Sequence, residues 1–296
     1  MKVAGYRLQV TCLKNLSRDF IVYCLLSIAY SGISSCGNSE TDSSLADKNA
    51  SRILDTTGGM KVMLLPSPLQ IASAVKLADI KYSQKIFDKT EKATADYQVS
   101  YLKALNLGIY SIDMGYAAVY NDYSVSAKYA SKIQAAMDDL GIESGVKKGT
   151  KERIQQNMNN NDTLYKIILE SYRDAHEYFK SNEREDVGLM ILTGAFIEGL
   201  YISSSLAKEN NSIELMRLIG MQKIFLQNIN ELLNKYADQK DIKSILAKMD
   251  VLNKTFSAID LHYDSASDKL TGGSISSEQL NQICLNTSAI RNEIIN

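Results

Sequence analysis

The chain has 296 residues, of which 45% are hydrophobic and 23% are charged. This composition is ordinary for a globular protein and excludes the disordered and fibrous classes. The first 35 residues hold four of the basic residues and one of the acidic residues, so 29 basic and 33 acidic residues remain in the rest of the chain. A body with a net charge of −4 and no basic run is a poor partner for nucleic acid, because phosphate binding needs clustered Lys and Arg.

The N-terminal segment has the pattern of a lipoprotein signal peptide, which we assign to residues 1–35. Its apolar run, Phe20–Ile33, has 14 residues. A helix needs about 20 residues to span a bilayer, so the run is too short for that and is typical of a signal-peptide core. The following ISSC at 33–36 resembles the bacterial lipobox, in which the cysteine, here Cys36, is lipidated and becomes the new N-terminus. The alternative is an ordinary signal peptide followed by an unrelated cysteine.

Lipidation of Cys36 predicts a membrane anchor, because each buried CH₂ group of an acyl chain contributes about 0.8 kcal/mol. Residues 36–66 are polar and small, which is typical of a flexible tether. We therefore expect an outer-membrane lipoprotein in the envelope of a Gram-negative bacterium, facing the periplasm. Glu40 and Asp42 resemble the acidic export tags of some surface lipoproteins, so the cell surface is the alternative location.

Helical periodicity dominates residues 67–296, which we expect to form a single all-α domain, a multi-helix bundle. The only prolines are Pro66 and Pro68, and 228 residues without proline follow them. No segment alternates apolar and polar residues over a sufficient length, so no β-strand is predicted. The apolar spacing and the capping residues predict about eight helices. Their approximate ranges are 68–87, 97–119, 124–140, 164–179, 184–208, 212–236, 241–261 and 277–296.

The second and fifth predicted helices form an internal repeat. A shift of 85 positions aligns Asp113 with Glu198 and Tyr116 with Tyr201, within two long apolar segments. This repeat predicts two copies of a three-helix unit, each with its most apolar helix in the middle, followed by two C-terminal helices. The alternative is a chance likeness between amphipathic helices.

Asp113 and Glu198 are the candidate catalytic residues. An unpaired carboxylate in an apolar interior costs several kcal/mol, so each acid must find a partner, face a cavity or hold a proton. If the two helices pack together, the acids could serve as the acid and base of a glycan hydrolase. The alternative is a structural role, in which each acid accepts a hydrogen bond from a tyrosine or a helix N-terminus in the other half.

Tyrosine is abundant, with 17 residues and no tryptophan. Tyr110, Tyr116 and Tyr201 are candidate ligand-binding residues, because tyrosines on a concave helical face could stack on a sugar or a peptide. The same three and Tyr120 are also the tyrosines expected to hydrogen-bond to the acids. The alternative is ordinary packing, with the ring inward and the hydroxyl in water.

Four glycines on the repeated helices predict a close approach of two helix backbones: Gly108, Gly115, Gly194 and Gly199. Glycine in a helix interior costs about 1 kcal/mol relative to alanine, so closer packing must compensate. The alternative is that these glycines leave room for a ligand. Their spacing matches neither a dinucleotide-binding nor a P-loop motif, so a phosphate-binding loop is not predicted.

No pattern in the sequence predicts a metal or a cofactor. Only two histidines are present, and G-x-S-x-G, HExxH and CxxC motifs are absent. Cys284 is the only cysteine after Cys36, so we expect a small buried apolar residue rather than a disulfide. We therefore expect a lipid-anchored binding or scaffold domain with a protein or small-molecule partner, rather than an enzyme. The glycan hydrolase is the alternative.

Three sequence runs carry a family resemblance: PSPLQI at 66–71, NLGIYSID at 106–113 and GAFIEGLY at 194–201. They resemble a family of all-helical lipoproteins of Gram-negative bacteria, and the likeness spans about residues 60–240. The resemblance implies an all-α fold and an envelope location. It implies no activity, because the family has no established one.

Overall fold

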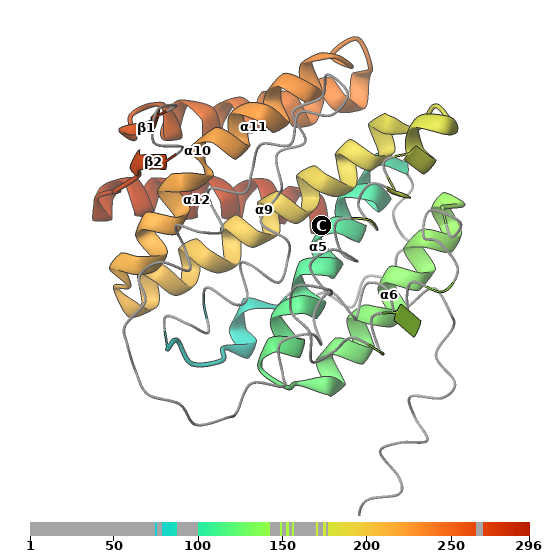
Figure 1. Ribbon diagram of the computed structural model, residues 1–296, viewed down its shortest axis with the longest axis horizontal. Coiled ribbons are helices and arrows are strands. Elements are labelled where there is room, and N and C mark those ends of the chain that lie inside the picture. Colours follow the sequence, from blue (N-terminus) through green and yellow to red (C-terminus); the bar gives the residue numbers. More distant parts are fainter. Residues whose placement is uncertain are drawn as a thin grey trace, which may run out of the picture.

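The computed structural model describes residues 79–87, 100–142, 177–264 and 269–296, with isolated positions between residues 75 and 175. Apart from one short hairpin, the elements in these ranges are helices, which confirms the predicted all-α class (Figure 1). Their bounds are η1 (Gln84–Ile86), α5 (Ser100–Val119), α6 (Tyr123–Leu140), α9 (Glu185–Asn210), α10 (Ile213–Asn234), α11 (Lys240–Ser257), β1 (Leu261–Asp264), β2 (Lys269–Gly272) and α12 (Ser277–Ile295). The leader, Cys36 and the tether lie outside the described residues.

Helices α5, α6, α9, α10, α11 and α12 match six predicted helices, with ends that differ by a few residues. The predicted helix 68–87 falls mostly outside the described residues, as does most of 164–179. Where 79–87 is described, the prediction of helix is wrong, because only the 3-10 turn η1 forms there. Contacts with other elements replace the helical hydrogen bonds: the Tyr82 hydroxyl donates to Asp122 Oδ2 at 2.8 Å, and the Ser83 N–H donates to the Tyr116 hydroxyl at 3.0 Å.

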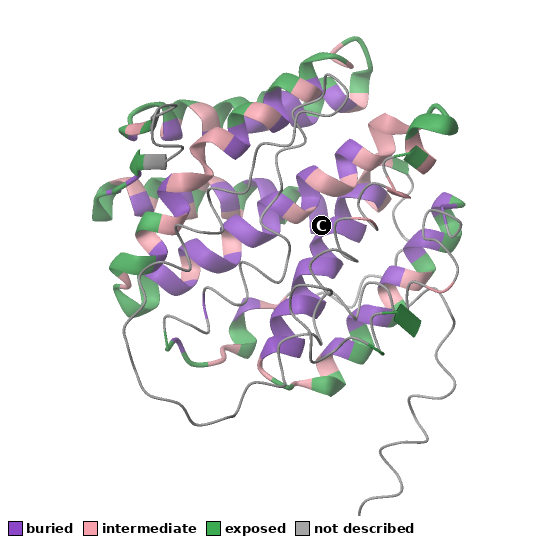
Figure 2. Ribbon diagram, in the orientation of Figure 1, coloured by how far each residue is buried: buried purple, intermediate pink, exposed green. Residues whose placement is uncertain are grey.

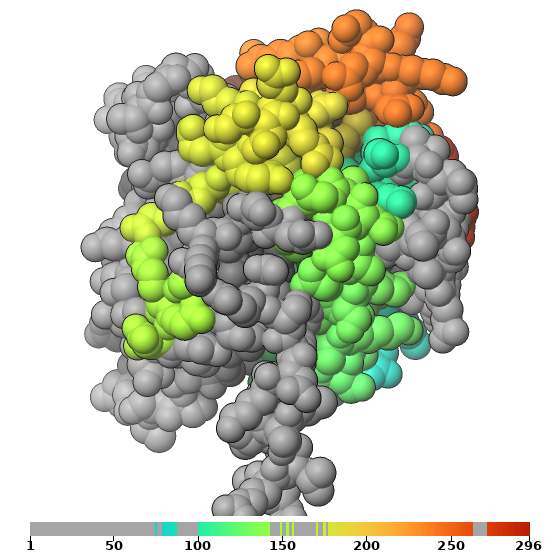
Figure 3. Space-filling view, turned by 90° about the vertical axis from the view of Figure 1, so that its right-hand side faces the viewer, coloured from blue at the N-terminus to red at the C-terminus, as the bar shows by residue number. Residues whose placement is uncertain are grey.

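Helix α5 lies in the centre of the described chain. Every residue from Ala104 to Val119 is buried, as Figure 2 shows along its length. A helix that is apolar all round must be covered on all sides, and α5 packs extensively against both α9 and α6. Among the described residues that are visible on the face drawn in Figure 3, most belong to α6, α9 and α11, and little of α5 is seen. The two repeated helices are therefore packed against each other in the core.

Two glycines bring α5 and α9 into backbone contact. A Cβ atom on Gly108 would lie 2.0 Å from the carbonyl oxygen of Ile191, and one on Gly194 would lie 2.0 Å from the carbonyl oxygen of Leu105. No side chain fits at either distance, so both positions require glycine. The close packing predicted for Gly108 and Gly194 is confirmed.

Helix α6 has a capping residue at each end, Asp122 before its first turn and Gly141 after its last. The side chain of Asp122 accepts the N–H of Val125 at 3.1 Å and caps the first turn. Gly141 follows the last turn with φ of 61°, the left-handed conformation that glycine adopts without strain. This confirms the predicted end of the helix at Gly141.

The three C-terminal helices pack on α9 or on one another. Helix α9 packs against α10 and α12, and α10 packs in turn against α11 (Figure 1). Helix α12 begins with a capping box formed by Ser276 and Gln279. Its last turn reaches α5, where the side-chain amide of Asn106 donates to the carbonyl oxygen of Ile294 at 3.1 Å. The C-terminus therefore lies beside the central helix.

A hairpin replaces the irregular connection expected between α11 and α12, so the prediction of no strand is wrong here. Strands β1 and β2 pair antiparallel, with Leu261 opposite Gly272. Gly272 and Gly273 have φ of 89° and 80°, which lets the chain turn away from the hairpin. The carbonyl oxygen of Gly273 packs so closely on α10 that a Cβ on Gly220 would lie 1.9 Å from it.

The predicted two-copy architecture is only partly covered by the described residues. Helix α5 packs on α6 and α9 packs on α10, so each repeated helix contacts the helix that follows it. The first helix of each predicted unit lies mostly outside the described residues. The duplication therefore stays a prediction, as does the domain boundary at residue 67.

Candidate functional site

Asp113 from α5 and Glu198 from α9 meet in one buried centre, and neither has exposed surface. Each acid follows the glycine crossing by little more than one helical turn, since Asp113 comes after Gly108 and Glu198 after Gly194. The close approach of the two backbones therefore brings the acids together. The internal repeat pointed to both positions.

Arg291 of α12 supplies the positive charge of this centre. Its Nε donates to Glu198 Oε2 at 2.5 Å, and the two side chains are 4% and 0% exposed. The guanidinium also lies over the ring of Tyr201, 4.4 Å from the ring centroid, in a cation–π contact. Burial opposes the charged form of Arg291, but the carboxylate of Glu198 outweighs this effect and raises the pKa of the guanidinium. Arg291 and Glu198 thus form a buried ion pair.

Asp113 has no such charge partner of its own. Burial, followed by the negative charge of Glu198, raises the pKa of the Asp113 carboxyl well above its usual range, and the charge of Arg291 only partly opposes the rise. The hydroxyl of Tyr129 also interacts with Asp113. Glu198 is a hydrogen-bonding neighbour of Asp113 as well, and this interaction also raises the pKa of Asp113. This environment favours the protonated, uncharged form of Asp113.

Tyr129 of α6 is the fourth side chain of the centre, after Asp113, Glu198 and Arg291. Burial raises the pKa of its hydroxyl, and the charges of Asp113 and Glu198 raise it further. Outside this layer, the ammonium group of Lys132 lies 4.9 Å from the ring centroid of Tyr110 and 5.7 Å from that of Tyr129. Lys132 is therefore a second cation close to Tyr129.

The three candidate tyrosines differ in burial. Tyr110 and Tyr116 are each only 1% exposed, and Tyr201 is half-buried beneath Arg291. The hydroxyl of Tyr116 accepts the Ser83 N–H, and the hydroxyl of Tyr120 donates to the carbonyl oxygen of Ile80 at 2.5 Å. These hydroxyls thus bind the 79–87 segment, and the described partner of Glu198 is an arginine rather than a tyrosine.

Aromatic side chains fill the space between α5, α6 and the 79–87 segment. Ring centroids lie 5.2–6.0 Å apart in a continuous cluster, distances typical of favourable aromatic pairs. The cluster consists of Tyr82, Phe87, Tyr110, Tyr116, Tyr120 and Tyr129. Tyr110 and Tyr116 meet their neighbours in this cluster at tilted or edge-on angles, so both contribute to packing.

A pair of acids that cleaves a glycan must open into a cleft that admits the sugar and a water molecule. Asp113 and Glu198 have no exposed surface, so their burial does not favour this use. A surface hollow of about 350 Å³ lies elsewhere, between α10 and the end of α11. It is lined by Lys223, Gln227, Asn253, Lys254, Phe256 and Ser257. The described residues contain no group of three or more His, Cys, Asp or Glu that could hold a metal ion.

Comparisons of the chain with protein families, with curated proteins and with solved structures give no match. The resemblance to helical lipoproteins therefore stays an expectation. Among the described helices, α9 is long and apolar enough to cross a membrane by length and composition alone, but 67% of its most apolar stretch is buried inside the protein. Such burial is equally typical of a core helix.

Two residues of the centre, Arg291 and Tyr129, were missed in the sequence. The signal for Arg291 was present, because Ile283, Thr287, Ile290 and Ile294 form a buried helical face on which it lies. Tyr129 stands on the buried face of α6 with Ile133 and Met137. An apolar face that includes one arginine predicts a buried acidic partner, and Glu198 was the candidate.

Proposed function

We propose that the chain is a lipid-anchored protein of the bacterial cell envelope whose helical body binds a partner or serves as a scaffold. The membrane anchor is supported by the signal-peptide core and the lipobox that ends at Cys36. Acyl chains on Cys36 would hold the protein at the outer membrane, and residues 36–66 would act as a flexible tether to the helical body.

The observation that carries the non-enzymatic role is the burial of both acids. Asp113 and Glu198 are 0% exposed, and Glu198 is paired with Arg291. An acid that is paired inside the core holds helices together and cannot reach a substrate. Binding would then use the outer surface of the helices.

The anchor is tested by expressing the full chain in a Gram-negative host with a clickable fatty acid. We expect the wild-type protein to carry the label and the Cys36→Ser variant to lose it. Cys284→Ser is the matched control and should keep the label, because Cys284 belongs to the helical body. Labelling that persists in Cys36→Ser would contradict the anchor.

The non-enzymatic role is tested by incubating the purified protein with fluorescent peptidoglycan. We expect no release of soluble glycan by the wild-type protein or by the Glu198→Gln variant. Release by the wild type that is lost in a folded Glu198→Gln variant would establish the hydrolase in place of our proposal.

A further inference from the structure

The surface hollow between α10 and the end of α11 is formed by one face of each helix. Lys223 and Gln227 are one helical turn apart on α10, and Asn253 and Ser257 are one turn apart on α11. The two helices pack against each other. The hollow has a volume of about 350 Å³, which is at the lower end of the range of small-molecule sites.

The end of α11 is held in place beside this hollow. Nζ of Lys223 donates to the carbonyl oxygen of Ser257 at 3.2 Å and to that of Ile259 at 2.5 Å. The ammonium group therefore balances the negative end of the α11 dipole. One turn earlier on α10, Gly220 lies directly against the carbonyl oxygen of Gly273, which follows the hairpin. These contacts fix the walls of the hollow, so its shape does not depend on a ligand.

The polar groups that line the hollow are donors rather than acids. Two of the six lining residues are lysines, two carry side-chain amides, and none is Asp or Glu. An ammonium group has three N–H donors, so the two contacts of Lys223 leave one for a ligand. Gln227 and Lys254 are exposed and Asn253 is half-buried, so their side chains can reach a molecule in the hollow.

We propose that this hollow binds a small molecule that carries a carboxylate or phosphate group. Hydrogen bonds from an ammonium group to an oxyanion are assisted by charge, and the amides of Gln227 and Asn253 can donate to the remaining oxygens. A cationic ligand would meet two ammonium groups and no acid among the lining residues. The inference rests on the binding role proposed above and names a ligand class for it.

NMR titration of the full chain, purified in detergent, tests the proposal with inorganic phosphate and with succinate. Sodium chloride at equal ionic strength gives the baseline. We expect the backbone amide signals of Asn253 and Lys254 to shift and to reach saturation with at least one of the two probes. The probe that saturates at the lower concentration shows which oxyanion the hollow prefers.

Lys254→Gln removes one of the two charges from an exposed position and should leave the fold intact. We expect it to weaken binding of the preferred probe by about fivefold, the upper range for an exposed ion pair. Lys243→Gln is the matched control, because Lys243 is an exposed lysine of the same helix that does not line the hollow. Binding to this control should equal binding to the wild type.

Shifts that never saturate with either probe overturn the proposal, and this outcome requires no variant. Equal weakening by Lys254→Gln and Lys243→Gln also overturns it, because the probes would then respond to the overall charge of the surface. The labelling of Cys36 and the peptidoglycan assay test the proposed function separately. A failed titration therefore concerns the hollow alone.

Discussion

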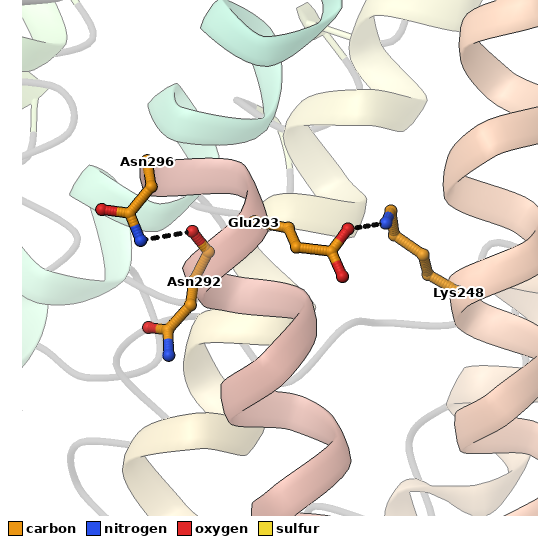
Figure 4. A network of polar contacts seen from close by, with 4 residues as sticks. All are labelled: Lys248, Asn292, Glu293 and Asn296. Atoms are coloured by element: carbon orange, nitrogen blue, oxygen red, sulfur yellow. Dashed lines mark hydrogen bonds and ion pairs between the residues drawn. The ribbon is translucent and has the colours of Figure 1, made fainter.

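Two ion pairs on helix α12 differ in burial. Arg291 pairs with Glu198 in the core, where the side chains are 4% and 0% exposed. Two positions further along, Glu293 pairs with Lys248 of α11 at the surface, where Lys248 is 29% and Glu293 is 61% exposed (Figure 4). Both pairs join α12 to another helix, so they allow a buried ion pair to be compared with an exposed one.

Burial decides what happens when one member of a pair is lost. At the surface, water solvates the remaining charge, and such pairs contribute about 0–1 kcal/mol. In the core, no water reaches the remaining charge, and the loss of one partner costs about 3–5 kcal/mol. The inner pair therefore fixes the position of α12, whereas the outer pair contributes little.

Arg291→Met gives the largest expected effect. The substitution keeps much of the side-chain volume but leaves Glu198 without its partner, so the free energy of unfolding should fall by about 3–5 kcal/mol. Urea denaturation followed by circular dichroism measures the change. A loss below about 1 kcal/mol would mean that the buried pair behaves like a surface pair and would contradict the comparison.

The backbone crossing of α5 and α9 gives the next effect, through Gly194→Ala. The new Cβ would meet the carbonyl oxygen of Leu105 at 2.0 Å, so the helices must separate, which costs about 1–3 kcal/mol. Gly188→Ala is the matched control in the same helix, because its Cβ would meet the movable ring of Phe179 at 2.9 Å. Thermal unfolding should show the larger loss for Gly194→Ala, and equal losses would argue against a tight crossing.

Lys248→Met gives the smallest effect. Because Glu293 stays hydrated, the free energy of unfolding should change by about 0–1 kcal/mol. The Debye screening length is about 3 Å in 1 M salt, so the attraction between exposed charges is largely screened. The difference in stability between Lys248→Met and the wild type should therefore disappear in 1 M NaCl. A loss as large as that of Arg291→Met would show that exposure does not separate the two pairs.

The sequence predicted the inner acids but not their arginine. Asp113 and Glu198 stood out because each is a single acid in a repeated apolar helix. Arg291 lies 93 positions from Glu198, beside the polar residues Asn292 and Glu293, so its neighbours suggested an exposed charge. Its place on the apolar face of α12 was visible in the helical period, but a pairing across that distance depends on tertiary packing.

The errors elsewhere also arise from tertiary contacts. The hairpin strands have four residues each, too few for an alternating pattern to be recognised. The 79–87 segment has helical spacing, but its polar groups bind Asp122 and Tyr116 in place of their own backbone. Helix ends and the glycine crossing were predictable because their causes are local or steric.

The most direct test of a structural polar centre is a double-mutant cycle with Glu198→Gln, Arg291→Met and both together. We predict that the double variant loses less free energy of unfolding than the sum of the two single variants, with an interaction energy near the upper end of about 0.5–3 kcal/mol. The reason is that the first substitution already removes the 2.5 Å ion pair. If the double variant loses as much free energy of unfolding as the two single variants together, the prediction is contradicted. The two side chains would then stabilise the protein independently.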